Sequence, residues 1–164
     1  MSDVLQQIAA TVTAEFSDLK DVREITQLSV RLLMAALLGG ILGFEREQRG
    51  KAAGLKTHTL VAVGAAFFVF IPQQVGITET HLGHVIQGVI AGVGFLGAGA
   101  ILKGDDERHF KGLTTAASIW ATAAIGVAAG LGRESSAILC TLLALLVLLV
   151  MPKIVDITNR KEKQ

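Results

Sequence analysis

Charged side chains gather in one short segment between two apolar runs, and their types suit ion pairing or anion binding. The segment, residues 43–58, reads GFEREQRGKAAGLKTH. Glu45 and Arg49 lie four residues apart with the acid first, the favourable order for an ion pair along a helix. Arg46 lies beside them, and Glu47 and Lys51 repeat the spacing. Charged helix ends are routine at membrane borders, so a solvated helix end and a functional site are both open interpretations.

Two glycines and a polar triplet complete this segment. Gly50 and Gly54 allow the backbone to turn sharply. Lys56, Thr57 and His58 then begin the next apolar run. Because the first turn of a helix carries a partial positive charge, the helix that begins here can hold an anion.

A second polar stretch, KGLTTAASIW at residues 111–120, begins another apolar run. Gly112 interrupts the chain, and the hydroxyl groups of Thr114 and Thr115 can cap the helix that follows. We expect this helix start to lie near the first segment. The candidate functional cluster is then Glu45, Arg46, Arg49, Gly54, Lys56, Thr57, Gly112, Thr114 and Thr115.

The six residues from Gly92 to Gly97 match G-x-G-x-x-G, the pattern of a dinucleotide-binding loop. That loop needs a strand before it and a helix that opens at its end. Here an uncharged run from Val85 to Leu102 continues through the glycines without a turn signal. The glycines therefore indicate a packing surface of a membrane helix rather than a nucleotide site.

Chemistry that needs a metal or a nucleophile finds little support. Asp105, Asp106 and Glu107 can attract Mg²⁺, but nearby lysines and arginines neutralise them, so a solvated loop is the preferred interpretation. Cys140, the one cysteine, lies in an apolar run. Nothing pairs a nucleophile with its base. We expect no enzyme activity, catalytic residue, metal site or cofactor, and no nucleic-acid partner.

Five long runs of low charge divide the chain. The composition is 51% hydrophobic and 18% charged, and each run is near the length that crosses a bilayer as a helix. The fold class predicted is all-α, a polytopic membrane bundle of about five transmembrane helices, with the lipid bilayer as its surroundings. The expected spans are 28–44, 57–75, 85–102, 113–131 and 135–151.

Lysine and arginine set the orientation of these spans, since cytoplasmic loops carry an excess of both. Eleven of the fifteen lie in the segments after the first and third spans and in the tail. The N-terminus is therefore expected outside and the C-terminus in the cytoplasm. Residues 1–24 lack the features of a signal peptide. Their apolar residues recur at helical spacing and predict an amphipathic helix on the outer face, where lipid contact and packing against the bundle are both open interpretations. The transmembrane domain is expected at 25–152 and a short basic tail at 153–164.

Three pairs of glycines with small-xxx-small spacing can let membrane helices approach closely. They are Gly39 with Gly43, Gly88 with Gly92, and Gly126 with Gly130. Packing within one chain and packing in a homodimer would use such faces equally well, so the homodimer is a hypothesis here.

Three stretches together resemble the MgtC/SapB (YhiD-like) family of bacterial membrane proteins. They are RLLMAALLGGILGFEREQRGKAAGLKTHTLVAVGAA, GVGFLGAGAILK and KGLTTAASIWATAAIGVAAG, and the likeness covers residues 31–151. It implies a small inner-membrane protein linked to growth in low magnesium, to survival in macrophages and to virulence. It further suggests restraint of the membrane ATP synthase and control by small peptides. Family members often have proline where Ala52 stands, and many carry a C-terminal ACT-like domain, which we expect this chain to lack.

The resemblance favours a non-enzymatic regulator of magnesium homeostasis or membrane energetics that works through the cytoplasmic cluster. A transporter or channel for Mg²⁺ or another small solute is the alternative, because a glycine-rich span can expose backbone carbonyls to a cavity. Against it, no Asp, Glu, Lys or His lies in the middle of a predicted span, where ion pathways usually have one. A scaffold for a partner membrane complex is a third hypothesis.

Overall fold

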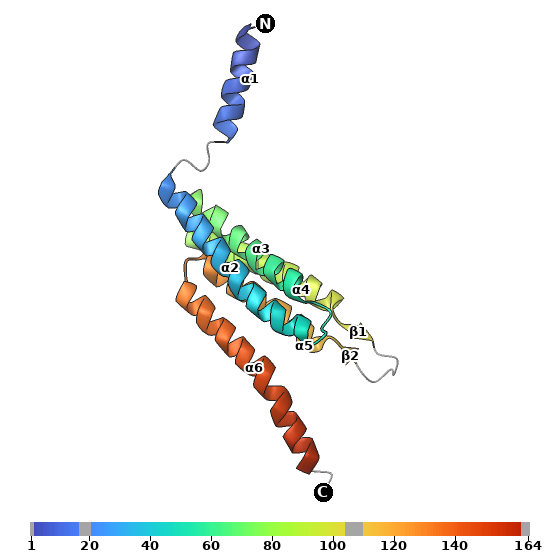
Figure 1. Ribbon diagram of the computed structural model, residues 1–164. Helices are drawn as coiled ribbons and strands as arrows, with labels where there is room; N and C mark the ends of the chain where they lie inside the picture. The colour runs from blue at the N-terminus through green and yellow to red at the C-terminus, as the bar shows by residue number, and fades with distance from the viewer. Residues whose placement is uncertain (1, 17–20, 104–109, 162–164) are drawn as a thin grey trace. The chain divides into compact units, whose positions relative to one another are not determined.

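A computed structural model describes residues 2–16, 21–103 and 110–161. The secondary structure of the described residues is helical apart from one small strand pair, with short turns between the elements (Figure 1). The helices are α1 (Ser2–Glu15), α2 (Val22–Gln48), α3 (Leu55–Gln74), α4 (Glu79–Gly99), α5 (Leu113–Gly130) and α6 (Glu134–Lys161). Strands β1 (Leu102–Lys103) and β2 (Phe110–Lys111) pair antiparallel, with Leu102 opposite Lys111.

Two compact units make up the chain, Met1–Val30 and Arg31–Gln164. The first contains α1, and the expected amphipathic helix is present there, although it ends at Glu15. The second contains the rest of α2 together with α3 to α6. The functional residues discussed below all lie in the second unit.

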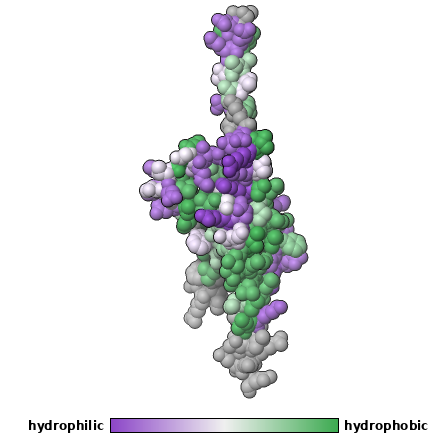
Figure 2. Space-filling model, turned by 90° about the vertical axis from the view of Figure 1, so that its left-hand side faces the viewer, coloured by the Kyte–Doolittle hydropathy of each residue, from purple (hydrophilic) through white to green (hydrophobic). Residues whose placement is uncertain are grey.

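The five predicted spans are confirmed as helices long and apolar enough to cross a membrane. The described helices α2 and α6 are longer than the predicted spans, since each continues into charged sequence. Helix α6 runs through Pro152 to Lys161, so the basic segment predicted as a tail begins as helix. A hydrophobic surface is what a helix bundle in lipid requires, and Figure 2 shows hydrophobic side chains over much of the second unit.

Helices α2 and α5 both pack against α3, and α5 also contacts α4 and α6. The contact with α3 is made by small residues, because Ala62 and Ala66 of α3 are fully buried. A Cβ atom built on Gly39 of α2 would lie 2.6 Å from the Cβ of Ala62, and one on Gly126 of α5 would overlap the Ala62 carbonyl oxygen. Only glycine therefore permits the distance at which α2 and α5 pack on α3.

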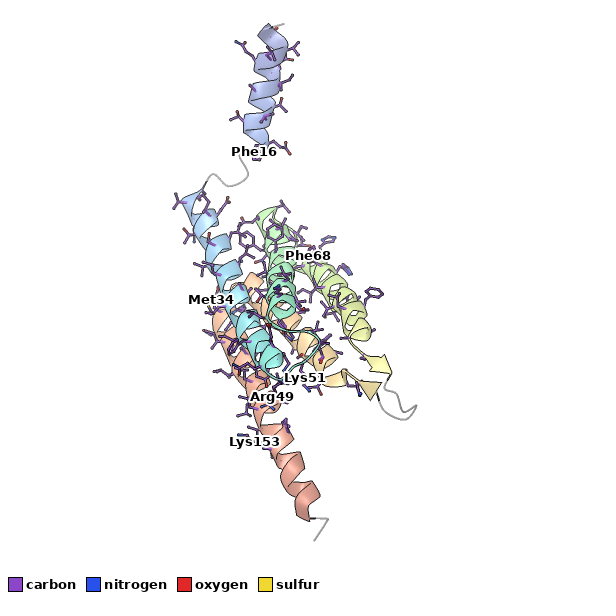
Figure 3. The ribbon with its side chains drawn as sticks, turned by 45° about the vertical axis from the view of Figure 1, so that its right-hand side comes forward. Phe16, Met34, Arg49, Lys51, Phe68 and Lys153 are labelled. Atoms are coloured by element: carbon purple, nitrogen blue, oxygen red, sulfur yellow. The ribbon has the colours of Figure 1, made fainter. Side chains whose placement is uncertain are left out.

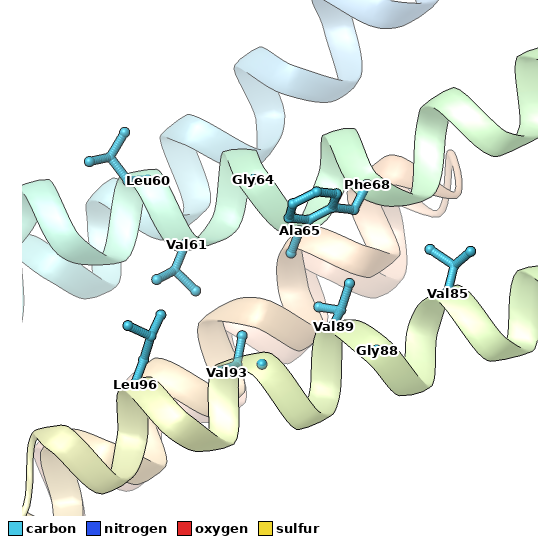
Figure 4. A pocket seen from close by; sticks show the side chains of 11 residues that line it. Leu60, Val61, Gly64, Ala65, Phe68, Val85, Gly88, Val89, Val93 and Leu96 are labelled. Atoms are coloured by element: carbon cyan, nitrogen blue, oxygen red, sulfur yellow. The ribbon is translucent and has the colours of Figure 1, made fainter.

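The glycine pair of α4 has different surroundings. Gly88 and Gly92 of α4 have no atom of another element within 4 Å of a built Cβ, and the same is true of Gly64 on α3. All three line an apolar groove of about 620 Å³ between α3 and α4 (Figure 4). Within the chain this pair makes no close helix contact, so the homodimer remains the packing hypothesis for it.

Candidate functional site

A glycine turn ends α2 and sets the direction of the charged segment. Gly50 has φ of +61°, a left-handed conformation that disfavours residues with a Cβ. Its N–H donates to the carbonyl of Glu47 at 2.9 Å, and the N–H of Lys51 donates to that of Arg46 at 3.0 Å. These two bonds form a Schellman motif, which satisfies the last carbonyls of the helix.

Glu47 ties the turn to the start of α3. Its Oε2 accepts a hydrogen bond from the N–H of Leu55 at 2.7 Å. The anion expected at this helix start is thus a carboxylate of the same chain. The spacing suggested that Glu47 pairs with Lys51, and that is wrong among the described contacts, because Gly50 carries Lys51 out of the helix before the turn is complete.

Gly54 provides room for this carboxylate. A Cβ atom there would lie 2.7 Å from Oε2 of Glu47, although the backbone of Gly54 is extended rather than left-handed. The sharp turn that we expected at both glycines is therefore made at Gly50, and Gly54 serves a close approach.

One carboxylate holds two guanidinium groups at the end of α2. Glu45 forms ion pairs with Arg46 and with Arg49, the second at 2.6 Å between Oε1 and Nε. The side chains of Glu45 and Arg46 are 11% and 3% exposed, whereas that of Arg49 is 38% exposed. Removing one partner of a buried pair leaves an uncompensated charge and is strongly destabilising. The predicted Glu45–Arg49 pair is confirmed.

The start of α5 lies beside this pair. Gly112 occupies the N-cap position with φ of +95°, and a built Cβ would overlap the carbonyl oxygen of Ala100. No side chain caps the helix, so capping by Thr114 or Thr115 is wrong. Glycine is needed at this N-cap position because the strand pair brings the backbone of Ala100 against it. Thr114 is exposed and Thr115 is buried.

The end of α2 and the start of α5 form a polar site that we call the charged corner. It comprises Glu45, Arg46, Arg49, Lys51 and Thr114, and an open hollow lies beside it. The hollow has a volume of about 560 Å³. Figure 3 shows Arg49 and Lys51 at the end of α2. The lining residues are Arg46, Arg49, Lys51, Thr114, Val147, Leu148, Met151 and Pro152.

The other predicted cluster residues lie outside the hollow. Lys56 and Thr57 are exposed and do not line it. The acidic group Asp105, Asp106 and Glu107 lies outside the described residues. Among the residues that the structure does describe, no three His, Cys, Asp or Glu side chains gather as metal ligands would.

His58 was not among the predicted site residues, yet it is fully buried. Its Nδ1 lies 3.0 Å from the carbonyl oxygen of Gly54, and its Nε2 lies 3.1 Å from Oγ of Ser118. A carbonyl can only accept, so Nδ1 donates its proton to Gly54. The single hydrogen of the Ser118 hydroxyl has two acceptors within reach, Nε2 of His58 and the carbonyl oxygen of Thr115 at 2.8 Å. Ser118 lies sixty residues away, which is why spacing could not reveal the contact. The signal available was a histidine one turn inside an apolar run.

Arg31 forms a second polar contact that sequence reasoning missed, at the other end of the bundle. An arginine near the end of a membrane span commonly extends its side chain to the membrane interface. Instead, Nη1 of Arg31 donates to the carbonyl of Gly130 at 2.9 Å, and the guanidinium lies 5.3 Å from the centre of the Phe70 ring. Gln73 donates to the same carbonyl at 3.1 Å. These donors satisfy the carbonyl at the end of α5.

Comparison with known proteins identifies the family. The sequence model of the MgtC family matches residues 32–157. The chain belongs to the MgtC family. SrpB of Synechococcus elongatus is 44% identical over 132 residues, which cover 74% of this chain and 72% of SrpB. No solved structure matches the chain significantly.

Two further relatives are longer than this chain. The protein named putative magnesium transporter YhiD in Escherichia coli is 42% identical over 73% of this chain and 58% of its own length. MgtC of Salmonella typhimurium is 41% identical over 71% of this chain and 48% of its own length. The chain thus spans about half the length of these two MgtC-family relatives, and with its five apolar helices it is a multi-pass membrane protein.

Proposed function

We propose that this MgtC-family protein is a non-enzymatic regulator in the bacterial inner membrane that supports growth in low magnesium. Its N-terminus would face outward and its C-terminus the cytoplasm, as the distribution of lysine and arginine favours. The link to magnesium is supported by similarity to the Escherichia coli relative named a putative magnesium transporter. Virulence and restraint of ATP synthase are family roles that the proposal leaves to experiment.

One observation carries the proposed working surface. Arg46 is buried and shares the carboxylate of Glu45 with Arg49. Burying charge costs free energy unless it is paired, and here positive charge exceeds negative beside an open hollow. Two other elements approach this point, since α3 is tied to α2 through Glu47 and α5 contributes Thr114. Such a surface suits an anionic ligand or an acidic segment of a partner.

Transport of Mg²⁺ or another small solute is the second candidate. The observation in its favour is a line of polar groups inside the helices, formed by His58, Thr115, Ser118 and Thr122, all buried. The hydroxyl oxygens of Ser118 and Thr122 lie 2.8 Å from carbonyl oxygens of their own helix, those of Thr115 and Ser118. The glycine contacts keep α3 and α5 close together along this line. A saturable, protein-dependent Mg²⁺ flux in proteoliposomes would favour transport over regulation.

Growth of a gene-deletion strain in magnesium-limited medium, with rescue from a plasmid, tests the proposal. We expect the deletion to grow poorly and the intact gene to restore growth. Arg49→Ala is the informative variant, because its side chain is partly exposed and its removal leaves Glu45 paired with Arg46. Arg133→Ala, an exposed arginine between α5 and α6, is the matched control.

Loss of rescue with Arg49→Ala, at an unchanged membrane level of protein, would support the charged corner as the working surface. Rescue by both Arg49→Ala and Glu45→Ala would remove the corner from the function. Normal growth of the deletion strain would remove the magnesium role itself. Co-purification of a membrane complex would then support the scaffold hypothesis.

A further inference from the structure

The hollow at the charged corner continues along α5 and α6 as an apolar groove. A second hollow of about 360 Å³ shares Thr114, Val147 and Leu148 with the first. Its remaining lining is apolar except for Ser118, and comprises Leu42, Ala117, Ser118, Ala121, Cys140, Leu143 and Ala144. The two hollows together form one continuous surface groove, which we call the amphipathic groove. Its head is the cationic hollow at the charged corner, and its body is the apolar hollow along α5 and α6.

The head of the groove carries more positive charge than its own carboxylates neutralise. Arg46, Arg49 and Lys51 line it, and Glu45 is the carboxylate that pairs with both arginines. Within the described part of the chain, no carboxylate lies within ion-pair distance of Lys51. Three cations against one carboxylate leave an excess of two positive charges at the mouth.

Arg46 and Arg49 can bind an anion without giving up Glu45. Arg46 contacts the carboxylate through Nε and Nη2, and Arg49 through Nε. A guanidinium carries five N–H donors, so each arginine retains donors for a second partner. Phosphate matches this donor geometry, and charge-assisted bonds to it are among the strong hydrogen bonds in proteins.

The body of the groove lies on the apolar part of the spans. Ala117 and Ala121 of α5 face the same hollow as Leu143 and Ala144 of α6. Alanine on one wall leaves space that a linear hydrocarbon chain can fill. A peptide in this position would bring backbone N–H and C=O groups into an environment with few partners, which is costly at membrane depth.

We propose that the amphipathic groove binds one anionic phospholipid. Its phosphate would lie against Arg46, Arg49 and Lys51, and one acyl chain would run between α5 and α6 toward Cys140. The apolar body distinguishes this ligand from a free phosphate ion, which would contact the head alone. The proposal concerns the surface named under the proposed function, and it deepens that function by assigning the ligand class.

Lipid binding to the purified full chain in detergent tests the proposal, with native mass spectrometry as the readout. The probes are dioleoyl phosphatidylglycerol, which is anionic, and dioleoyl phosphatidylcholine, which has the same chains and no net charge. We expect the anionic lipid to bind preferentially. Arg49→Ala with Lys51→Ala should weaken its binding about 30-fold, since each basic residue near an anionic lipid contributes about 1 kcal/mol. Lys56→Ala with Arg133→Ala removes two exposed cations elsewhere and should have no such effect.

A second variant tests the apolar body. Ala117 is exposed, so Ala117→Leu fills the groove without disturbing buried packing. It should weaken phosphatidylglycerol binding while leaving the cations in place. Equal binding of both lipids, or equal effects of the two double variants, would overturn the proposal. Glycerol 3-phosphate binding as tightly as the lipid would also overturn it and indicate a soluble phosphate ligand.

The growth assay and the lipid assay can fail separately. Preferential phosphatidylglycerol binding by a protein whose deletion has no growth defect would support the groove and reject the magnesium role. If the protein shows no preference for the anionic lipid but growth rescue still depends on Arg49, the lipid proposal is rejected. The charged corner is then retained as the working surface.

Discussion

Two glycine pairs with the same spacing have opposite surroundings in this structure. Gly126 and Gly130 of α5 press against carbonyl oxygens of α3, whereas Gly88 and Gly92 of α4 face an open groove. The difference lies in the opposing wall. Alanines of α3 meet α5, whereas the α3 wall of the groove combines Gly64 and Ala65 with larger side chains such as Phe68 (Figure 4). Small-xxx-small spacing therefore marks a helix face without large side chains. The residues on the opposing helix determine whether that helix packs closely against this face.

The largest loss of stability should come from a substitution on the face of α5 that packs against α3. In Gly126→Ala the new methyl group overlaps the Ala62 carbonyl oxygen, and a backbone atom cannot move without separating the helices. We expect a loss of about 3 kcal/mol of unfolding free energy, at the upper end of typical overpacking costs. Reversible denaturation of the detergent-solubilised protein measures it. Unfolding at the wild-type midpoint would show that α3 and α5 are farther apart than described.

A somewhat smaller loss of stability should follow from a substitution on the face of α2 that packs against α3. Gly39→Ala brings a methyl group to 2.6 Å from the Cβ of Ala62 and 2.8 Å from the carbonyl oxygen of His58. We expect a loss of about 2 kcal/mol. Because one of the two clashes is with a side chain, adding Ala62→Gly should recover part of it. Strictly additive effects in this double-mutant cycle would contradict the contact.

The polar contact between α3 and α5 should contribute less to stability than either glycine contact. Ser118→Ala removes the hydroxyl that lies 3.1 Å from Nε2 of His58. Hydrogen bonds between membrane helices average about 0.6 kcal/mol in double-mutant cycles, so we expect a loss of about 1 kcal/mol or less. The same unfolding experiment measures it, with Ser135→Ala at an exposed position as the control. A loss as large as that of Gly126→Ala would mean that His58, rather than glycine packing, holds α3 to α5.

The sequence was sufficient to predict the five spans, because bilayer thickness fixes the length of an uncharged run. It was also sufficient for the Glu45–Arg49 pair, since both residues lie within one regular helix. It failed where the partner belongs to another element. Glu47 was paired with Lys51 by spacing, but its partner is the N–H of Leu55 beyond the turn.

Contacts between distant residues were beyond reach for the same reason. Neither Arg31 with Gly130 nor His58 with Ser118 follows from any local period, because each joins helices whose rotation is set by packing. Glycine spacing likewise located three bare faces without indicating which of them are filled. Local chemistry was thus predictable from the chain, and the pairing of faces required the structure.

The smallest effect should come from the open groove, and it also tests the homodimer. Gly88→Ala and Gly92→Ala place methyl groups where no other element lies within 4 Å. If lipid fills the groove, the unfolding free energy in lipid vesicles should change by no more than about 0.5 kcal/mol. If a second chain fills it, these methyl groups meet a close helix contact, and the loss should approach that of Gly39→Ala and depend on protein concentration. Gly92→Cys in a Cys140→Ser background supplies the independent readout, since two copies that meet at this face would form a cross-linked dimer and two that do not would remain monomers.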